Sequence, residues 1–496
     1  MSESVAGAVV PPARSEPGLA IDVRRLGMPT MLSYGFGQVA EALKNAGFGA
    51  FLLFYYQQIV GLSGTLTATA LAISLVLDAF CDPVAGALSD RLRSRWGRRH
   101  PYIALSAVPL AVSFYLLFNP PAGMGDLGHF VWLLSFAILA RLALTCYQVP
   151  HLALGAEIAH DYSQRSTLYS FNVLFGSLGG AVGTALAYRA FFPTTQEFSP
   201  GLLNVAGYHQ FSVAFGAAMI VAIAVCVLGT AREIPHLPVL ARLHQRFSLL
   251  QVGREVMTAF RNPSFRTLFL GMMLATLMLA IEGVFAPYMG VHFWGLTTEQ
   301  ISLLPLVSVF GLIGSLLLIP PVTRWLDKKM TLIYTSLIAI FNGNVLICVH
   351  LVYPDLLPAR GSSLLLALIA VTTFIGALMG PLIFATLNSM FADIADEHEL
   401  ETGERREGII FAARSFAIKA TSSLGLIIGG IVLDWIAFPR QARAGSVADD
   451  VLWNMGFITG PFTSLFVVIG VLMYLGYRLD RTRHAEILVE LARRRG

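Results

Sequence analysis

Long apolar stretches recur along almost the whole of this 496-residue chain, and they restrict what it can fold into. A helix needs about 20 apolar residues to cross the hydrocarbon core of a bilayer, because each residue adds only ~1.5 Å of length. Hydrophobic residues make up 55% of the chain and charged residues 13%, whereas a soluble domain carries about 25% charged residues. The sequence therefore predicts an all-α integral membrane protein.

The stretches number twelve, and we expect each to form one transmembrane helix. They lie at residues 29–58, 65–89, 102–120, 128–158, 167–192, 208–230, 265–293, 299–322, 330–353, 362–392, 409–437 and 451–477. A longer polar connection at the midpoint separates two sets of six, an arrangement typical of the major facilitator fold. The predicted parts are an N-terminal tail (1–28), an N-terminal half (29–230), a linker (231–264), a C-terminal half (265–477) and a C-terminal tail (478–496).

Arginine and lysine residues concentrate in every second loop, most densely in SDRLRSRWGRRHP at 89–101. Basic loops remain on the cytoplasmic side of a membrane, so both termini are predicted to be cytoplasmic. The N-terminal tail has no apolar signal-peptide core, and the loops are short, which favours a bacterial inner membrane.

Asp78 and Asp82 stand in the middle of the second stretch, where no other residue of 65–89 is charged. An aspartate near a bilayer centre costs about 2.5–3.5 kcal/mol on insertion scales, so its presence indicates a functional site. Because the two are four residues apart, a helix places both carboxylates on one side. Close carboxylates can hold a hard cation such as Na⁺, or they can share a proton. The pair predicts the cation site of a transporter.

Other polar residues interrupt the remaining stretches. Arg141, Thr145 and Gln148 fall on one helix face and indicate the wall of a polar cavity. Lys419 lies deep in the eleventh stretch and needs an acidic partner, for which Asp78 or Asp82 is expected.

Glu41 and Lys44 are three residues apart in the first stretch, so they either neutralise each other or bind the substrate. With Arg141 and Gln148, the candidate substrate-binding residues are Glu41, Lys44, Asn45, Asn172 and Glu282.

Charged residues at the cytoplasmic mouth are expected to form gating contacts. In the N-terminal half these are Asp90, Arg91, Arg95, Arg98 and Arg99. In the C-terminal half, 393–407 is expected to be a solvated loop in which Asp393 and Asp396 are balanced by basic residues such as Arg405 and Arg406. We predict no cofactor, and no metal site other than Na⁺ at Asp78 and Asp82.

Several motifs together resemble one family. They are LDAFCDP (77–83), SRWGRR (94–99), VPHLALGAEIAHDYSQR (149–165) and the TGERREG loop (402–408) leading to FAIK (416–419). The chain is similar, over nearly its whole length, to the glycoside–pentoside–hexuronide:cation symporters of the major facilitator superfamily. The resemblance implies that Asp78 and Asp82 coordinate the coupling cation, with Thr145 as a further ligand and Lys419 close by.

The sugar-binding positions depart from the pattern of a galactoside-carrying member of the family. Where that pattern has two aspartates and an arginine, this chain has Ala42, Gln148 and Val173. Galactoside transport is therefore not expected. Another polyol would suit the polar side chains of Lys44, Asn45, Gln148 and Asn172, and an anionic solute such as a hexuronide would suit Arg141.

The sequence predicts a secondary active symporter, not an enzyme, that couples Na⁺ or H⁺ entry to uptake of a sugar, glycoside or hexuronide-like solute. Its partners would be the solute, a monovalent cation and the bilayer, with no nucleic acid, and it would act as a monomer. Cation-coupled transport of a lysolipid or other amphiphile, and proton-coupled export, remain open. A non-transporting receptor is disfavoured because the cation-site residues are all present, and no HExxH or GxSxG motif indicates an enzyme.

Overall fold

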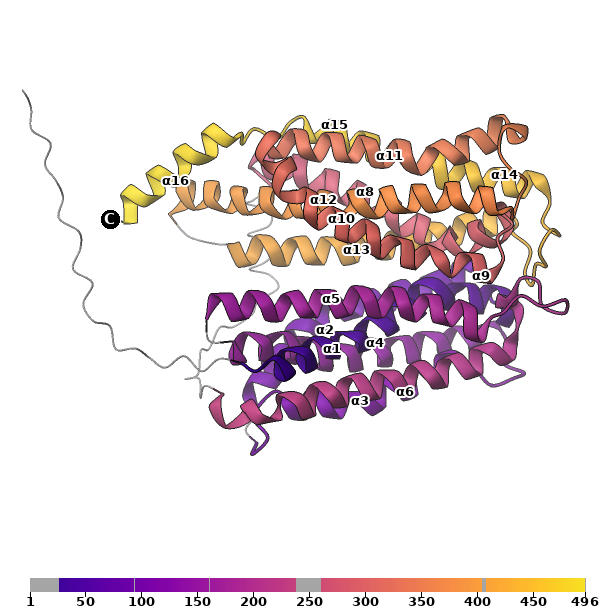
Figure 1. The fold of residues 1–496 in the computed structure, drawn as a ribbon, viewed down its shortest axis with the longest axis horizontal. Coiled ribbons are helices and arrows are strands. Elements are labelled where there is room, and N and C mark those ends of the chain that lie inside the picture. The colour runs from indigo at the N-terminus through magenta and orange to yellow at the C-terminus, as the bar shows by residue number, and fades with distance from the viewer. Residues whose placement is uncertain (1–25, 93, 160, 238–259, 404–406, 496) are drawn as a thin grey trace, which may run out of the picture.

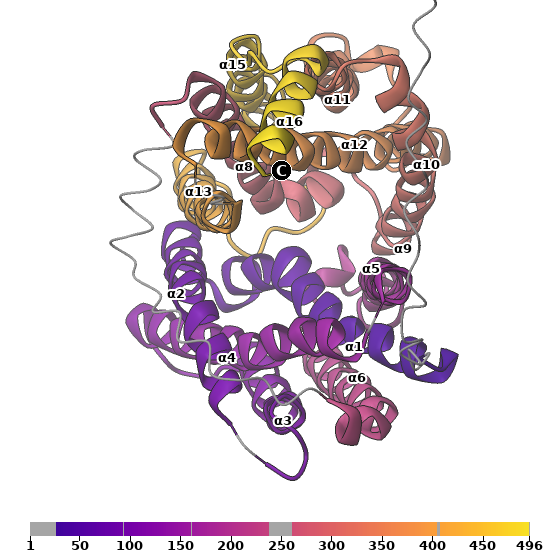
Figure 2. The same cartoon turned by 90° about the vertical axis from the view of Figure 1, so that its left-hand side faces the viewer.

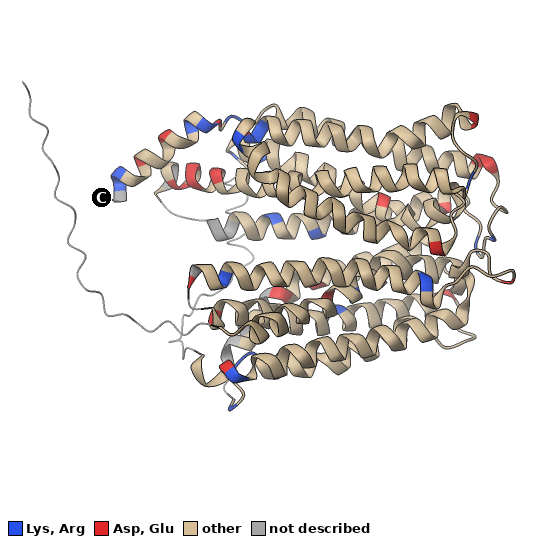
Figure 3. Cartoon of the chain, viewed as in Figure 1, with Lys and Arg blue, Asp and Glu red and all other residues tan. Residues whose placement is uncertain are grey.

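The computed structural model describes residues 26–92, 94–159, 161–237, 260–403 and 407–495. In these residues the chain forms a bundle of long helices that run roughly side by side (Figure 1). Positions of Lys, Arg, Asp and Glu along the ribbon are concentrated toward the two ends of the bundle, and few lie in its middle (Figure 3). This distribution fits a molecule whose middle is surrounded by lipid, because charged groups are costly in hydrocarbon.

The first six long helices form one half of the bundle. Their bounds are α1 (Met28–Ala46), continued by the π-helical turns η1 (Gly47–Leu52) and η2 (Tyr55–Val60); α2 (Gly64–Arg91); α3 (His100–Leu117); α4 (Asp126–Ile158); α5 (Tyr162–Leu186), continued by η3 (Ala187–Phe191); and α6 (Val205–Thr230). Two short 3₁₀ helices, η4 (Gly201–Leu203) and η5 (Ala231–His236), flank α6.

The other half begins at α8. Its helices are α8 (Pro263–Tyr288) with η6 (Met289–Phe293), α9 (Thr298–Ile301), α10 (Leu303–Trp325), α11 (Lys328–Val352), η7 (Pro354–Leu356), α12 (Ser363–Thr402), α13 (Glu407–Trp435), α14 (Asp449–Phe457) with η8 (Ile458–Phe462), and α15 (Thr463–Tyr474). A final helix, α16 (Arg481–Arg495), projects beyond one end of the bundle (Figure 1).

Eleven helices in the described residues are long and apolar enough to cross a bilayer. The remaining long helix, which runs from Met28 to Val60 through α1, η1 and η2, is not among them. Glu41, Lys44 and Asn45 interrupt its apolar run. The predicted all-α membrane fold is therefore confirmed, while composition supports eleven of the twelve predicted spans.

The expectation of a loop over 393–407 is wrong for its first ten residues. Helix α12 continues through Asp393 and Asp396 to Thr402, and Gly403 then ends it with φ at 74°. No glycine or proline occurs between Pro381 and Gly403, so nothing in the backbone stops the helix until a residue that readily adopts a left-handed conformation.

The two halves lie against each other along two pairs of helices, α2 with α13 and α5 with α10 (Figure 2). Helices α2 and α13 approach very closely where α2 begins. A Cβ atom on Gly430 would lie 2.4 Å from the carbonyl oxygen of Gly64, so no larger residue fits there without a shift. Small residues allow membrane helices to come into backbone contact in this way.

The described hydrogen bonds between the halves fall into two groups. One group lies at the end of the bundle opposite α16, where Asp434 accepts bonds from the backbone N–H groups of Gly64 (2.9 Å) and Thr65 (2.8 Å). At the same end, the N–H of Thr194 donates to Glu299 across 2.7 Å. The other group lies halfway along α2 and forms the candidate site.

Candidate functional site

Three helices bring four polar side chains together in the middle of the bundle. On α2, Asp78 and Asp82 lie one turn apart, as their spacing predicted. From α4, the Thr145 hydroxyl lies 2.9 Å from Asp78 Oδ1 and 3.2 Å from Asp82 Oδ1. From α13 in the other half, Lys419 Nζ donates to Asp78 Oδ2 (2.8 Å) and Asp82 Oδ2 (2.6 Å). We call these four residues the acid-pair cluster.

The acid-pair cluster can accept a further cation. Its two carboxylates and one ammonium leave one negative charge, and two carboxylates with a hydroxyl are the oxygen ligands that hard cations prefer. The Asp78 side chain is 15% exposed and that of Asp82 is 40% exposed, so an ion can reach the pair. No group of three or more His, Cys, Asp or Glu suited to another metal occurs within the described ranges.

A layer of positive charge lies one helical turn from the acid-pair cluster, toward the end opposite α16. On α4, Arg141 precedes Thr145 by four residues, and on α2 Ser74 precedes Asp78 by four. Arg141 Nε donates to Ser74 Oγ across 2.9 Å. The guanidinium carbon lies 5.2 Å from the centre of the Phe48 ring, and Lys44 Nζ lies 4.3 Å from the same ring.

Glu41 and Lys44 do not form the ion pair that their spacing allowed. Glu41 instead accepts bonds from Gln38 Nε2 (2.5 Å) and Asn45 Nδ2 (3.4 Å). Among the described residues, the hydrogen bond of Lys44 Nζ goes to the amide oxygen of Asn45, at 3.4 Å. Gln148 of α4, which was predicted to bind the substrate, contacts Glu41.

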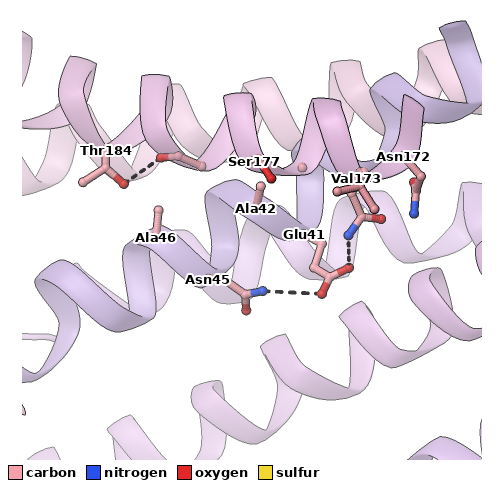
Figure 4. A pocket seen from close by; sticks show the side chains of 11 residues that line it. Glu41, Ala42, Asn45, Ala46, Asn172, Val173, Ser177 and Thr184 are labelled. Atoms are coloured by element: carbon pink, nitrogen blue, oxygen red, sulfur yellow. Dashed lines mark hydrogen bonds between the residues drawn. The ribbon is translucent and has the colours of Figure 1, made fainter. Parts of the chain in front are cut away.

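A pocket of about 500 Å³ lies between α1 and α5. Ala42 of α1 and Ser177 of α5 face each other across it, and Glu41 and Asn45 are hydrogen-bonded at its edge (Figure 4). Asn172 also lines it and is 7% exposed, and its Oδ1 has no hydrogen-bond partner among the described residues. Pockets of roughly 300–1,000 Å³ hold small organic molecules in proteins. Two polar residues predicted from distant segments, Asn45 and Asn172, therefore share one cavity.

Glu282 is not brought into this region by any described contact. It lies on α8 in the other half, and no hydrogen bond or ion pair joins it to a residue of the described ranges. Its assignment to the substrate site stays a prediction.

The basic motif after α2 is bound to an acid that the sequence analysis did not select. Arg98 Nη2 and Arg99 Nε both contact Glu157 Oε1, at 2.7 and 2.9 Å, and Arg99 Nη1 donates to Ser89 across 2.6 Å. Glu157 ends α4 within the same half, so these arginines fasten the α2–α3 loop to α4. Arg95 is exposed.

Asp393 and Asp396 are bound by basic residues other than those predicted. Lys328 Nζ lies 2.8 and 2.7 Å from the two carboxylate oxygens of Asp393. From α16, His484 Nε2 lies 3.1 Å from Asp396 and 3.4 Å from Asp393. The side chains of Asp90 and Arg91, and the whole of Arg405 and Arg406, lie outside the described residues.

Comparison with known proteins agrees with this architecture. The family model "MFS/sugar transport protein" matches residues 33–481. The chain is 25% identical to the inner membrane symporter YicJ of Escherichia coli K12, over 91% of this chain and 90% of that one. It is 26% identical to the putative glycoside/cation symporter YagG of the same organism, over 95% and 96%.

Solved structures with this fold are also known. The nucleoside transporter NupG superposes with a TM-score of 0.59 at 13% identity, covering 90% of this chain and 99% of that one. The family model spans most of the sequence, and the structure has the helical membrane architecture of such transporters. The chain therefore belongs to the MFS/sugar transport protein family, whose members are membrane transporters.

Proposed function

We propose that this protein is a secondary active symporter that couples entry of Na⁺ or H⁺ to uptake of a sugar, glycoside or hexuronide-like solute. The observation that carries the proposal is the acid-pair cluster, in which two intramembrane carboxylates meet a hydroxyl and an ammonium from different helices. Ionisable residues inside a membrane mark ion pathways in transporters.

The coupling cation would bind at Asp78 and Asp82, with Thr145 as a third oxygen ligand, and would displace Lys419. Because the aspartates belong to one half and Lys419 to the other, this exchange replaces a bond between the halves with a bond inside one half. Cation binding would thereby change how firmly the halves are held together, which is what coupling to alternating access requires.

The solute would bind beside the cation, against α1, α4 and α5. The polar side chains available there are those of Glu41, Lys44, Asn45, Arg141, Gln148 and Asn172. The pocket of about 500 Å³ between α1 and α5 is large enough for a sugar ring and a substituent.

The charged contacts near the α16 end would act as gating elements. In one half they hold the α2–α3 loop to α4 through Arg98, Arg99 and Glu157. In the other half they hold α11 and α16 to α12 through Asp393 and Asp396. We further propose that the two halves are the units 29–230 and 265–477, that both termini are cytoplasmic, and that the protein is a monomer of the bacterial inner membrane.

A thermal-shift screen tests the proposal. Purified protein would be heated with a panel of glycosides, uronides and lysolipids, each with and without Na⁺ and at two pH values. We expect one solute class to stabilise the protein only when the coupling cation is present, because a ligand at 100 times its Kd adds about 2.7 kcal/mol.

Asp78→Asn should lose this cation dependence, whereas the control Asp126→Asn, which alters an exposed acid at the start of α4, should keep it. Unchanged cation dependence in Asp78→Asn would contradict the proposal. Stabilisation by lysolipids alone would replace the sugar with an amphiphile as the solute.

A further inference from the structure

We infer that Lys44 and Arg141 form a binding subsite for an anionic group, a carboxylate or a phosphate, on the transported solute. The inference rests on the proposed function and narrows its solute to one that carries a negative charge. We call the two residues the cation pair.

The cation pair lies in the membrane part of the molecule, with Lys44 buried and Arg141 half-buried, and neither is bound to an acid of the described residues. Lys44 is 3% exposed, and its hydrogen bond goes to the uncharged amide of Asn45. Arg141 donates to the uncharged hydroxyl of Ser74. Among the described residues, no carboxylate forms an ion pair with either cation. A cation that is withdrawn from water and not bound to a carboxylate is unfavourable, so an anion from outside the chain would be stabilised at this site.

The neighbouring carboxylates are already bound to other groups. Asp78 and Asp82 accept hydrogen bonds from Lys419 and Thr145. Glu41 accepts hydrogen bonds from Gln38 and Asn45. Asp78 attracts both cations of the pair and Glu41 attracts Lys44, but these acids direct their hydrogen bonds elsewhere, so no carboxylate of the described residues accepts a hydrogen bond from the cation pair.

The aromatic ring of Phe48 brings the two cations to one place. Lys44 Nζ lies 4.3 Å and the Arg141 guanidinium 5.2 Å from its centre. A ring face attracts a cation only weakly compared with a carboxylate, so this contact positions the charges without neutralising them. The hydrogen bond to Ser74 comes from Nε of Arg141. The planar guanidinium, with its several N–H donors, suits the paired oxygens of a carboxylate or phosphate.

The anion would lie next to the coupling cation. Arg141 and Thr145 are one turn apart on α4, as are Ser74 and Asp78 on α2, so the two sites are about 5 Å apart along the helices. A cation at the acid pair and an anion at the cation pair would attract each other, and each would strengthen binding of the other. The arrangement thus supplies a direct electrostatic reason for coupling.

The test compares probes that share a glucopyranose ring and carry either a neutral or an anionic group at C6. Binding of methyl glucuronide, methyl glucoside and glucose 6-phosphate to the purified full-length protein would be measured in saturating Na⁺ at pH 7. We expect the better of the two anions to bind about 10- to 100-fold more tightly than the glucoside, because hydrogen bonds between charged groups are that much stronger. Whichever anion is preferred tells whether a carboxylate or a phosphate is the natural group.

Lys44→Gln and Arg141→Gln should each remove most of this preference, and Arg141→Lys should keep part of it. Arg360→Gln, which removes an exposed cation beside His350, is the matched control and should retain the full preference. Equal binding of glucoside and both anions by the unaltered protein would overturn the subsite, as would failure of both anions to bind.

The outcomes separate this inference from the proposed function. Cation-dependent binding of the glucoside without preference for an anion would refute the subsite and leave cation-coupled transport standing. Preferred binding of an anion that is unchanged by Na⁺, by pH and by Asp78→Asn would support the subsite and contradict coupling at the acid pair.

Discussion

At the scale of single residues, Lys419 is the group that most affects the acid-pair cluster. Its ammonium holds both aspartates at 2.8 and 2.6 Å and is itself 25% exposed. A coupling cation at the proposed site would compete with this ammonium for the same two carboxylates. In the structure the protein's own cation therefore occupies the position that we propose for the coupling ion.

Lys419→Gln should destabilise the protein. Without the ammonium, the two carboxylates lie one helical turn apart with no positive group between them, and their negative charges repel each other. Because the side chains are partly exposed, we expect a loss of roughly 1–3 kcal/mol at pH 7. Thermal unfolding at that pH measures the effect.

Asp78→Asn should suppress most of that loss in the double variant, since it removes one of the repelling charges. Equal stability of Lys419→Gln and the unaltered protein would show that the ion pairs contribute nothing.

The sequence identified Asp78, Asp82 and Lys419 because ionisable groups stand out in apolar stretches, whereas the place of Thr145 beside them was expected only from the family resemblance. It did not identify Ser74 or Phe48, since a serine or phenylalanine inside a membrane helix is unremarkable. It also allowed a pair between Glu41 and Lys44. Spacing alone cannot decide that pair, because Gln38 and Asn45 compete for the same carboxylate.

At the scale of helices, the start of α2 is held by a residue of the other half. The first N–H groups of a helix have no partner inside it and attract negative charge. Asp434 of α13 accepts two of them, from Gly64 and Thr65. The glycine contact between Gly64 and Gly430 brings the backbones close enough for this cap. The cap is a contact that opening of this end must break.

Asp434→Ala should favour opening at the end opposite α16, because it removes both hydrogen bonds. A cysteine in place of Thr65, in the protein with its other cysteines replaced, should react faster with an impermeant maleimide when Asp434 is absent. We expect an increase of about 5- to 30-fold, since a capping interaction contributes ~1–2 kcal/mol.

Asp449→Ala removes an exposed acid at the start of α14 and should leave the labelling rate unchanged. A rate that is the same with and without Asp434 would mean that the cap does not hold this end closed.

The lengths of most helices can be predicted from their apolar stretches, but a polar continuation of a helix beyond its apolar stretch cannot. Helix α12 continues through ten residues that were expected to form a loop, and Asp393 and Asp396 on it meet Lys328 and His484. Acidic residues fit a solvated loop and an exposed helix equally well. Only the absence of a helix breaker before Gly403 distinguished the two.

At the scale of the whole molecule, the contacts between the halves describe one state of a transport cycle. The described hydrogen bonds between them lie in the acid-pair cluster and at the end opposite α16. The molecule is therefore held together at that end. The hydropathy pattern predicted the two sets of helices, but it could not predict which end is joined, because residues such as Gly64 and Asp434 are far apart in the chain.

The central claim is that Asp78 and Asp82 couple a cation gradient to solute uptake. Its most direct test is accumulation of a labelled solute in vesicles containing the purified protein, with Na⁺ and H⁺ gradients imposed separately. The unaltered protein and the Asp126→Asn control should concentrate the solute under one of the two gradients. Asp78→Asn and Asp82→Asn should show no gradient-driven accumulation. Full accumulation in either aspartate variant would contradict the account.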